Sequence, residues 1–350
     1  MPKKTSHDNS GRLSPSTLLL ALLRQLRHPK NKLREFALRN LKVGDDEIKA
    51  VGPVLQRISW SDASVREQIE NYGVKVLPIN FYSNTPSFED IRTSFEYNEA
   101  DAPYLSERVF DPGILKRTLA EITQYCSEFN PVLDGDETHC QSFFWKNPQF
   151  SYSDAMAYYC FVRKLKPKTI IEIGSGFSSL IAIEALKRNE YGKLICIEPF
   201  PRPFLDTNTW ISLVKQKAQE LTAEYLNDTL QDGDILFIDS THTVKTGSDC
   251  LHIYLRLLPS IQRNIHVHVH DVFLPFGMPK QWLQDNQTFW TEQYLLLALI
   301  TDNPRARVCY GSAYHHAFNK ELLDRMMNNK YPSGGGSFWF EYAADEAPGN

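Results

Sequence analysis

Hydrophobic and polar positions follow two different patterns along the chain. Up to about residue 135, apolar residues recur at helical spacing, as Leu18, Leu22 and Leu26 do. From residue 167 onward, short apolar runs alternate with amphipathic stretches. This alternation predicts strands and helices in turn, which is the pattern of an α/β fold with a mainly parallel sheet.

The expected strands are apolar on both faces, as a parallel sheet covered by helices on both sides requires. They are 169–173, 193–198, 234–239, 265–270, 307–311 and 337–342. The helices expected between them are 178–189, 203–230 in several pieces, 247–260, 288–301 and 319–328. Two further helices, 111–129 and one that opens with 151–165, are expected before the first strand.

The chain of 350 residues is expected to have three parts. Residues 1–12 are expected to be disordered, as polar chain ends often are. Residues 13–150 are expected to form a mainly helical region that covers the ligand crevice. Residues 151–345 are expected to form the α/β domain.

Charge is distributed unevenly along the chain. Residues 1–50 contain eleven Lys or Arg and five Asp or Glu, whereas the whole chain has a net charge of −4. The rest of the chain is therefore acidic, which argues against a large basic groove, so nucleic acid is not expected as a partner. We interpret the basic arm as a solvated helix or a chain end, with docking to a partner as the alternative.

Two features bear on the location of the protein. The longest apolar runs, 17–23 and 294–300, are far shorter than the ~20 residues of a membrane span, so no transmembrane segment is expected. The six cysteines are scattered without a CxxC pair, which is typical of reduced thiols in the cytoplasm, the expected location. A homo-oligomer stays open at this stage.

A glycine turn after the first expected strand carries the most chemical information. Here the chain runs from a buried strand into a helix. Two glycines let the backbone approach a ligand closely, and the first N–H groups of a helix have no partner within it. The turn therefore predicts a cofactor site formed by Gly174, Ser175, Gly176 and Phe177.

Two acidic residues near this turn narrow the choice of cofactor. Glu172 lies in an apolar strand, where an unpaired carboxylate is costly, so a cationic ligand group such as an amino-acid ammonium is expected beside it. Glu198, followed by Pro199, ends the next strand and is placed to bind two ribose hydroxyls. S-adenosylmethionine (SAM) carries both groups. NAD would use Glu198 but not Glu172, and Ser179 replaces the third glycine of the dinucleotide fingerprint.

These features resemble motif I of the class I SAM-dependent methyltransferases. The segments most similar to the branch called methyltransferase domain family 24 are IEIGSGFSS (171–179), IEP (197–199), GDILFIDS (233–240), VHVHDVFLP (267–275), WTEQYLL (290–296) and SFW (337–339). The resemblance covers roughly residues 80–340. It implies a Rossmann-like, seven-stranded α/β sandwich with a helical N-terminal extension, SAM as the cofactor, and methyl transfer.

Four side chains that follow the fourth and fifth expected strands are predicted to act on the acceptor. Asp239 and His242 follow the fourth strand, and His270 and Asp271 follow the fifth. Asp239 is also expected to bind the cofactor near its sulfonium. Ligands bind beyond the carboxyl ends of parallel strands, so these four should share one crevice. His270 is expected to deprotonate an acceptor hydroxyl, because neutral imidazole is available near pH 7. Alternatively, Asp239 and Asp271 hold one Mg²⁺ ion.

The sequence therefore predicts a SAM-dependent methyltransferase that acts on a small-molecule or glycan acceptor, with a hydroxyl as the expected acceptor group. Two alternatives remain. One is an NAD-dependent oxidoreductase, and the other is a non-catalytic SAM-binding interaction module whose basic arm docks a partner.

Overall fold

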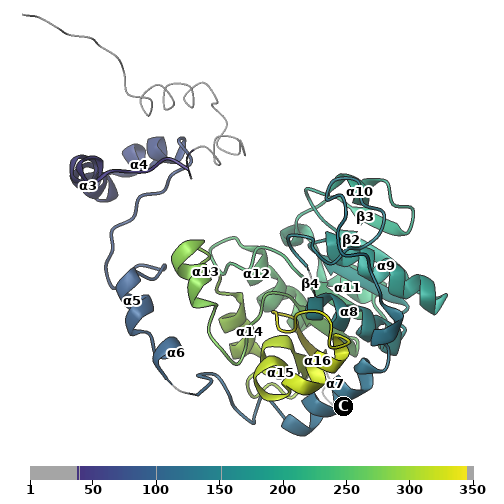
Figure 1. The fold of residues 1–350 in the computed structure, drawn as a ribbon. Helices are drawn as coiled ribbons and strands as arrows, with labels where there is room; N and C mark the ends of the chain where they lie inside the picture. The colour runs from purple at the N-terminus through teal and green to yellow at the C-terminus, as the bar shows by residue number, and fades with distance from the viewer. Residues whose placement is uncertain (1–37, 39, 100, 151, 345–350) are drawn as a thin grey trace, which may run out of the picture. The chain divides into compact units, whose positions relative to one another are not determined.

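The computed structural model describes residues 38, 40–99, 101–150 and 152–344 (Figure 1). By its internal contacts the chain divides into two compact units, residues 1–87 and 88–350. The expectations for residues 1–12 and for the helix around Leu22 lie outside the described residues. Residues 88–150, which we assigned to the helical N-terminal region, fall in the same compact unit as the sheet.

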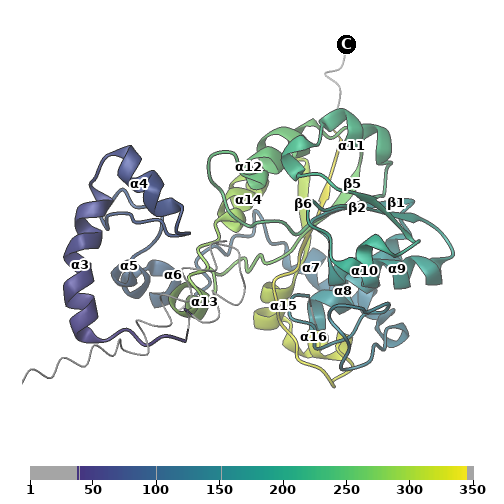
Figure 2. The same ribbon diagram turned by 90° about the horizontal axis from the view of Figure 1, so that it is seen from above.

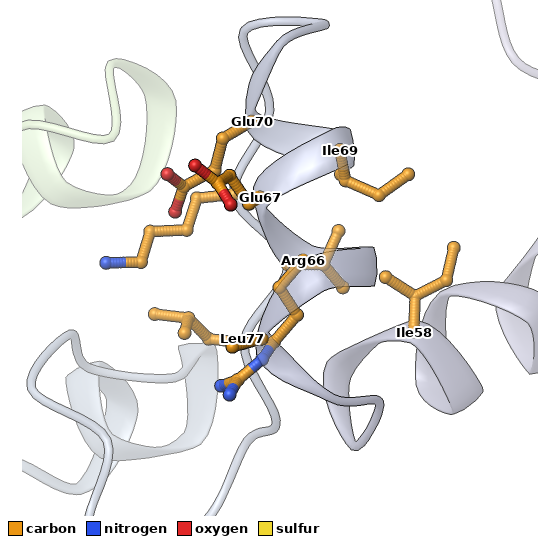
Figure 3. A pocket seen from close by; sticks show the side chains of 9 residues that line it. Ile58, Arg66, Glu67, Ile69, Glu70 and Leu77 are labelled. Carbon is orange, nitrogen blue, oxygen red and sulfur yellow. The ribbon is translucent and has the colours of Figure 1, made fainter.

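The described part of the first unit contains α3 (Asp45–Ser59), α4 (Ala63–Glu70) and a loop that continues to residue 87. Among its described residues only Ser59 is buried, so the described part of this unit has no hydrophobic core of its own. A hollow of about 490 Å³ lies beside α4 (Figure 3). Its lining mixes apolar side chains with charges of both signs: Ile58, Ala63, Arg66, Glu67, Ile69, Glu70, Lys75, Val76 and Leu77.

A seven-stranded sheet forms the centre of the second unit. The strands are β1 (Thr169–Ile173), β2 (Lys193–Ile197), β3 (Ile211–Val214), β4 (Ile235–Ile238), β5 (Ile265–Val269), β6 (Ala306–Gly311) and β7 (Phe338–Tyr342). Their order is β3-β2-β1-β4-β5-β7-β6, and β7 alone runs antiparallel to both of its neighbours. The predicted Rossmann-like, seven-stranded α/β fold is thus confirmed.

Helices cover both faces of this sheet. Alternate residues of each strand point to opposite sides, so each face has its own hydrophobic core. Ile170 of β1 and Phe237 of β4 belong to one core, and Ile171 and Leu236 to the other. Figure 2 shows α11, α12 and α14 on one side of the sheet and α8, α9 and α10 on the other. The helices are α5 (Phe88–Thr93), α6 (Phe95–Asn98), α7 (Pro112–Thr123), α8 (Tyr152–Leu165), α9 (Phe177–Asn189), α10 (Pro203–Asp206), α11 (Ala223–Thr229), α12 (Asp249–His252), α13 (Lys280–Asp285), α14 (Glu292–Ile300), α15 (Ser312–Phe318) and α16 (Lys320–Met326).

One strand was not expected from the sequence. β3 lies within the stretch 203–230 that we assigned to helices. It is an edge strand that pairs only with β2, and all four of its residues keep some exposure to solvent. A four-residue edge strand lacks the fully apolar run by which the central strands were recognised.

Two simpler expectations can be compared with the structure. The six cysteines are all free thiols and are buried, which agrees with the expectation of reduced thiols. Within the described part of the chain, no helix is both long and apolar enough to cross a membrane.

Candidate active site

The turn between β1 and α9 is tied to two neighbouring strands. Gly174 N–H donates to the carbonyl of Ile197 at the end of β2 (3.0 Å), and Asp239 N–H donates to the carbonyl of Ile173 (2.9 Å). Gly174 has a φ of +83°, and a Cβ added there would lie 1.8 Å from the carbonyl oxygen of Asp239. Only glycine fits so close to that backbone, so the ends of β1 and β4 meet at this residue.

A cavity of about 380 Å³ lies at the carboxyl ends of β1, β2 and β4. It is lined by Ile173, Gly174, Ile197, Glu198, Pro199, Phe200, Lys217, Ala218, Gln219, Asp239, Ser240, Thr241 and Asp249. Pockets for small organic ligands usually measure about 300–1,000 Å³. Of the residues predicted to bind the cofactor, Gly174, Glu198, Pro199 and Asp239 line this cavity.

The other predicted cofactor residues do not line the cavity. Ser175 and Gly176 form the turn itself, and Phe177 is buried in the core, with its ring centroid 5.5 Å from those of Phe144 and Phe204. Lys217, Gln219 and Asp249 were not predicted from the sequence to line a ligand site. The first two follow β3, so recognising that strand would have been the signal for them.

Polar atoms at the cavity are available to a ligand. Glu198 accepts hydrogen bonds from the N–H groups of Ser175 (3.3 Å) and Phe200 (2.8 Å). A carboxylate has about four acceptor positions, so these bonds fix Glu198 and still leave capacity for hydroxyl donors. The hydroxyl of Ser240 is buried without a hydrogen-bond partner within the described residues. Such an atom is normally paired, which suggests a partner supplied by a ligand.

The hydrogen-bond partners of Glu172 are hydroxyl groups of the protein, whereas we expected a ligand ammonium. It has no exposed surface, and its carboxyl accepts hydrogen bonds from the hydroxyls of Tyr158 (3.0 Å) and Ser179. These residues belong to α8 and α9, because Glu172 points to the face of β1 that these helices cover. Burial raises the pKa of the Glu172 carboxyl to about 7, against the hydrogen bonds that lower it. The structure thus corrects the expectation of a cationic ligand group beside Glu172.

This raised pKa predicts a pH-dependent effect of Glu172→Gln. Between pH 4.5 and about 7 the Glu172 carboxyl is ionised in the unfolded chain but still protonated in the folded protein, so rising pH favours the unfolded chain. Above about pH 7 the carboxyl is ionised in both states, and the stability no longer changes with pH. The stability of the wild type relative to the always neutral Gln variant should therefore fall by about 2–3 kcal/mol from pH 5 to pH 8. Urea unfolding of both proteins at the two pH values measures this. A stability difference that does not change with pH would contradict the assignment.

Two histidines and two aspartates form a cluster at the ends of β4 and β5. His242 Nε2 lies 3.2 Å from Asp239 Oδ1 and 3.7 Å from Asp271 Oδ2. His270 Nδ1 lies 3.4 and 3.7 Å from the same two oxygens. All four residues predicted to act on the acceptor are thus brought together, and Asp239 belongs to both the cluster and the cavity.

Each histidine contacts another carboxylate on its far side. His242 Nδ1 lies 2.7 Å from Glu292 Oε2, and Glu292 also accepts a hydrogen bond from the Tyr254 hydroxyl (2.8 Å). His270 Nε2 lies 3.4 Å from Asp154 Oδ2. Glu292 and Asp154 are both buried. Asp154 and Tyr254 were not predicted from the sequence to belong to this site.

The acidic surroundings change the protonation of both histidines. Burial alone would lower the pKa of His242, but hydrogen bonds to Asp239 and Glu292 raise it to about 10. Burial likewise opposes the charged form of His270, and Asp271 and Asp239 raise the pKa of this histidine well above its usual value. This corrects the expectation of a neutral His270. Carboxylates on both sides of its imidazole favour the protonated form of His270.

A row of half-buried aromatic rings begins beside His242 of the cluster. The Trp290 ring lies over His242, with centroids 4.4 Å apart, and Trp282 packs edge-on against Trp290 at 5.6 Å. Phe273 packs edge-on against Trp282 at 5.3 Å. All three aromatic side chains keep some exposure to solvent. They form an apolar wall beside the polar cluster.

Comparison with known proteins agrees with this geometry. A family model described as a methyltransferase domain matches residues 171–272, the range that holds the glycine turn, Glu198 and the His–Asp cluster. Together with the strand order, this match confirms the predicted relationship to the class I methyltransferases. The matched residues all lie in the second unit.

Similar individual proteins were also found. An uncharacterised protein of Archaeoglobus fulgidus is 27% identical over 194 residues, which cover 53% of this chain and 83% of that protein. A putative O-methyltransferase from Klebsiella pneumoniae aligns at 15% identity with a TM-score of 0.36, covering 67% of this chain and 91% of that one. An O-methyltransferase from Bacillus cereus, solved with S-adenosylhomocysteine (SAH), aligns at 14% identity with a TM-score of 0.35. The alignment covers 65% of this chain and 90% of that one.

Proposed function

We propose that the chain transfers the methyl group of SAM to a hydroxyl of a small-molecule or glycan acceptor. The observation that carries this proposal is the shared position of Asp239. Its side chain belongs to the His–Asp cluster, and it also lines the cavity that contains Gly174 and Glu198. A donor in the cavity and an acceptor at the cluster would meet at Asp239, and methyl transfer depends mainly on such alignment.

The residues of the cavity fit SAM. Gly174 lets the backbone approach the methionine part, and Glu198 accepts hydrogen bonds from the ribose hydroxyls. Ser240 offers its unpaired hydroxyl. Lys217 and Gln219 line the same cavity and would contact the base. In this proposal Glu172 supports the glycine turn through Ser179 and does not touch the cofactor.

The acceptor would bind between the cluster and the aromatic wall of Trp290, Trp282 and Phe273. Within the cluster the carboxylates of Asp239 and Asp271 would receive the proton of an acceptor hydroxyl, because they favour the protonated form of both histidines. The apolar wall would exclude water and orient the acceptor. SAM bound in the cavity supplies the electrophilic methyl group.

Substitution of Glu198 tests the cofactor assignment. We expect Glu198→Ala to weaken SAH binding by about 10- to 100-fold, because two charge-assisted hydrogen bonds to the ribose are lost. Glu198→Gln keeps one acceptor oxygen, so its affinity for SAH should lie between those of the wild type and Glu198→Ala. Isothermal titration calorimetry measures the affinities, with Asp228→Ala, an exposed acid on α11, as the control that keeps full affinity. Unchanged SAH binding by Glu198→Ala would refute the assignment.

A further inference from the structure

We propose that residues 17–34 of this chain dock on the apolar face of α3 and in the hollow beside α4. The surface that receives them belongs to the described part of the first unit, and the docking segment is inferred from its sequence. The inference goes beyond the proposed function, because neither its argument nor its test depends on methyl transfer.

Apolar side chains form an exposed stripe along α3. Ile48, Val51 and Leu55 recur three or four residues apart, which places them on one face of the helix, and Ile58 continues this stripe at the end of the helix. The first three residues are between 41% and 56% exposed. Such a stripe normally packs against a hydrophobic core. The described part of the first unit has no such core, so another segment is needed to cover the stripe.

The stripe leads into the hollow beside α4. Ile58 belongs to the stripe and also lines the hollow, as do Ile69 and Leu77 (Figure 3). The two helices have only fifteen and eight residues. Helices of this length are marginal in water unless their apolar faces are packed. An apolar segment that covers the stripe and fills the hollow would therefore stabilise both helices.

Residues 17–34 have the apolar pattern that this surface requires. Leu18, Leu22 and Leu26 recur every four residues, which predicts one apolar face of a helix. The ten residues 35–44 connect this segment to α3 and can span up to roughly 33 Å. The fifteen residues of α3 give a helix about 22 Å long. The connection is therefore long enough for the segment to return along the whole of α3.

Charge favours this segment over a second copy of the same surface. Residues 17–34 contain five Lys or Arg and no Asp or Glu, whereas residues 45–70 contain six Asp or Glu and three Lys or Arg. Glu67 and Glu70 lie one turn apart on α4 and both line the hollow, where like charges repel each other (Figure 3). The basic segment would offset this repulsion. A second copy of residues 45–70 would add to it.

Hydrogen exchange of the full chain, followed by mass spectrometry, tests the proposal. Amides of packed helices open far less often than amides of frayed ones, so residues 45–70 should be protected in the wild type. Leu22→Asp should speed their exchange by about 100-fold or more, because it places a charge in the docked face. Leu20→Asp is the matched control. Leu20 is two residues from Leu22 and lies on the opposite side of the predicted helix, so its substitution should leave the protection unchanged.

The same measurement from the other side of the contact should give a reciprocal result. Leu55→Asp on the stripe should speed exchange in residues 17–34, whereas Gln56→Asp, the next residue round α3, should not. Protection of α8 and α9 in every variant shows that the second unit stays folded.

Three outcomes would overturn the proposal. The first is a lack of protection in residues 45–70 of the wild type. The second is equal exchange in Leu22→Asp and Leu20→Asp. The third is protection that disappears on dilution while sedimentation shows a dimer dissociating, which would assign the surface to a second copy of the chain.

Discussion

Gly174→Ala is expected to reduce SAH affinity by about 100-fold or more. The added Cβ would lie 1.8 Å from the carbonyl oxygen of Asp239, and a backbone atom cannot move aside as a flexible side chain can. The ends of β1 and β4 must therefore separate, which distorts the cavity that Gly174 and Asp239 both line. Calorimetry with SAH measures the loss of binding, and urea unfolding measures the accompanying loss of stability.

Gly233→Ala is a matched control for this prediction. Gly233 has a φ of +85°, close to the +83° of Gly174, but a Cβ added there has no atom within 4 Å. Both variants carry the backbone penalty of about 1–2 kcal/mol for a non-glycine residue in this conformation, and only Gly174→Ala adds the clash. Equal effects of the two substitutions on SAH binding would contradict the role given to the Gly174 turn.

Asp154→Ala is expected to lower the free energy of unfolding by about 3–5 kcal/mol. This buried carboxylate on α8 accepts hydrogen bonds from the N–H groups of Gly336 (3.0 Å) and Ser337 (2.9 Å) and from the Ser312 hydroxyl (2.7 Å). Alanine would leave all three donors buried without an acceptor. The loop before β7 would lose these three bonds and keep the hydrogen bonds between Gly334 and Ser153 of α8. Urea unfolding measures the effect.

The control for Asp154 is another aspartate that forms an ion pair at the surface. Asp134 lies 3.1 Å from Lys146, with 71% of its side chain exposed, so Asp134→Ala should cost no more than about 1 kcal/mol. Asp154→Asn keeps one acceptor oxygen, so its free energy of unfolding should lie between those of the wild type and Asp154→Ala. A loss of less than about 1 kcal/mol for Asp154→Ala would show that these hydrogen bonds do not hold the loop.

The parts of the fold that the sequence predicted are those with a strong local pattern. The central strands were recognised because residues such as Ile171 and Leu236 form fully apolar runs. The edge strand β3 has no such run, and the ligand-lining Lys217 and Gln219 were missed with it. The proximity of Asp239 and His270 could be predicted from the sequence, because both residues follow parallel strands that are neighbours in the sheet.

The partners of the site residues were harder to predict, because they come from distant helices. Tyr158 reaches Glu172 from α8, and no local signal in the sequence links the two. Asp154 precedes His270 by more than one hundred residues, and Glu292 follows His242 by fifty. A carboxylate on a helix is usually a solvated surface group, so only tertiary packing identifies these two as partners of the cluster.

The central claim is that the cavity at the ends of β1, β2 and β4 binds SAM. Calorimetric titration of the full chain with SAH, and separately with NADH, tests it most directly, because both ligands would use Glu198. We predict saturable binding of one SAH per chain and no binding of NADH. Binding of NADH without SAH would contradict the claim in favour of an oxidoreductase, and binding of neither would contradict it as well.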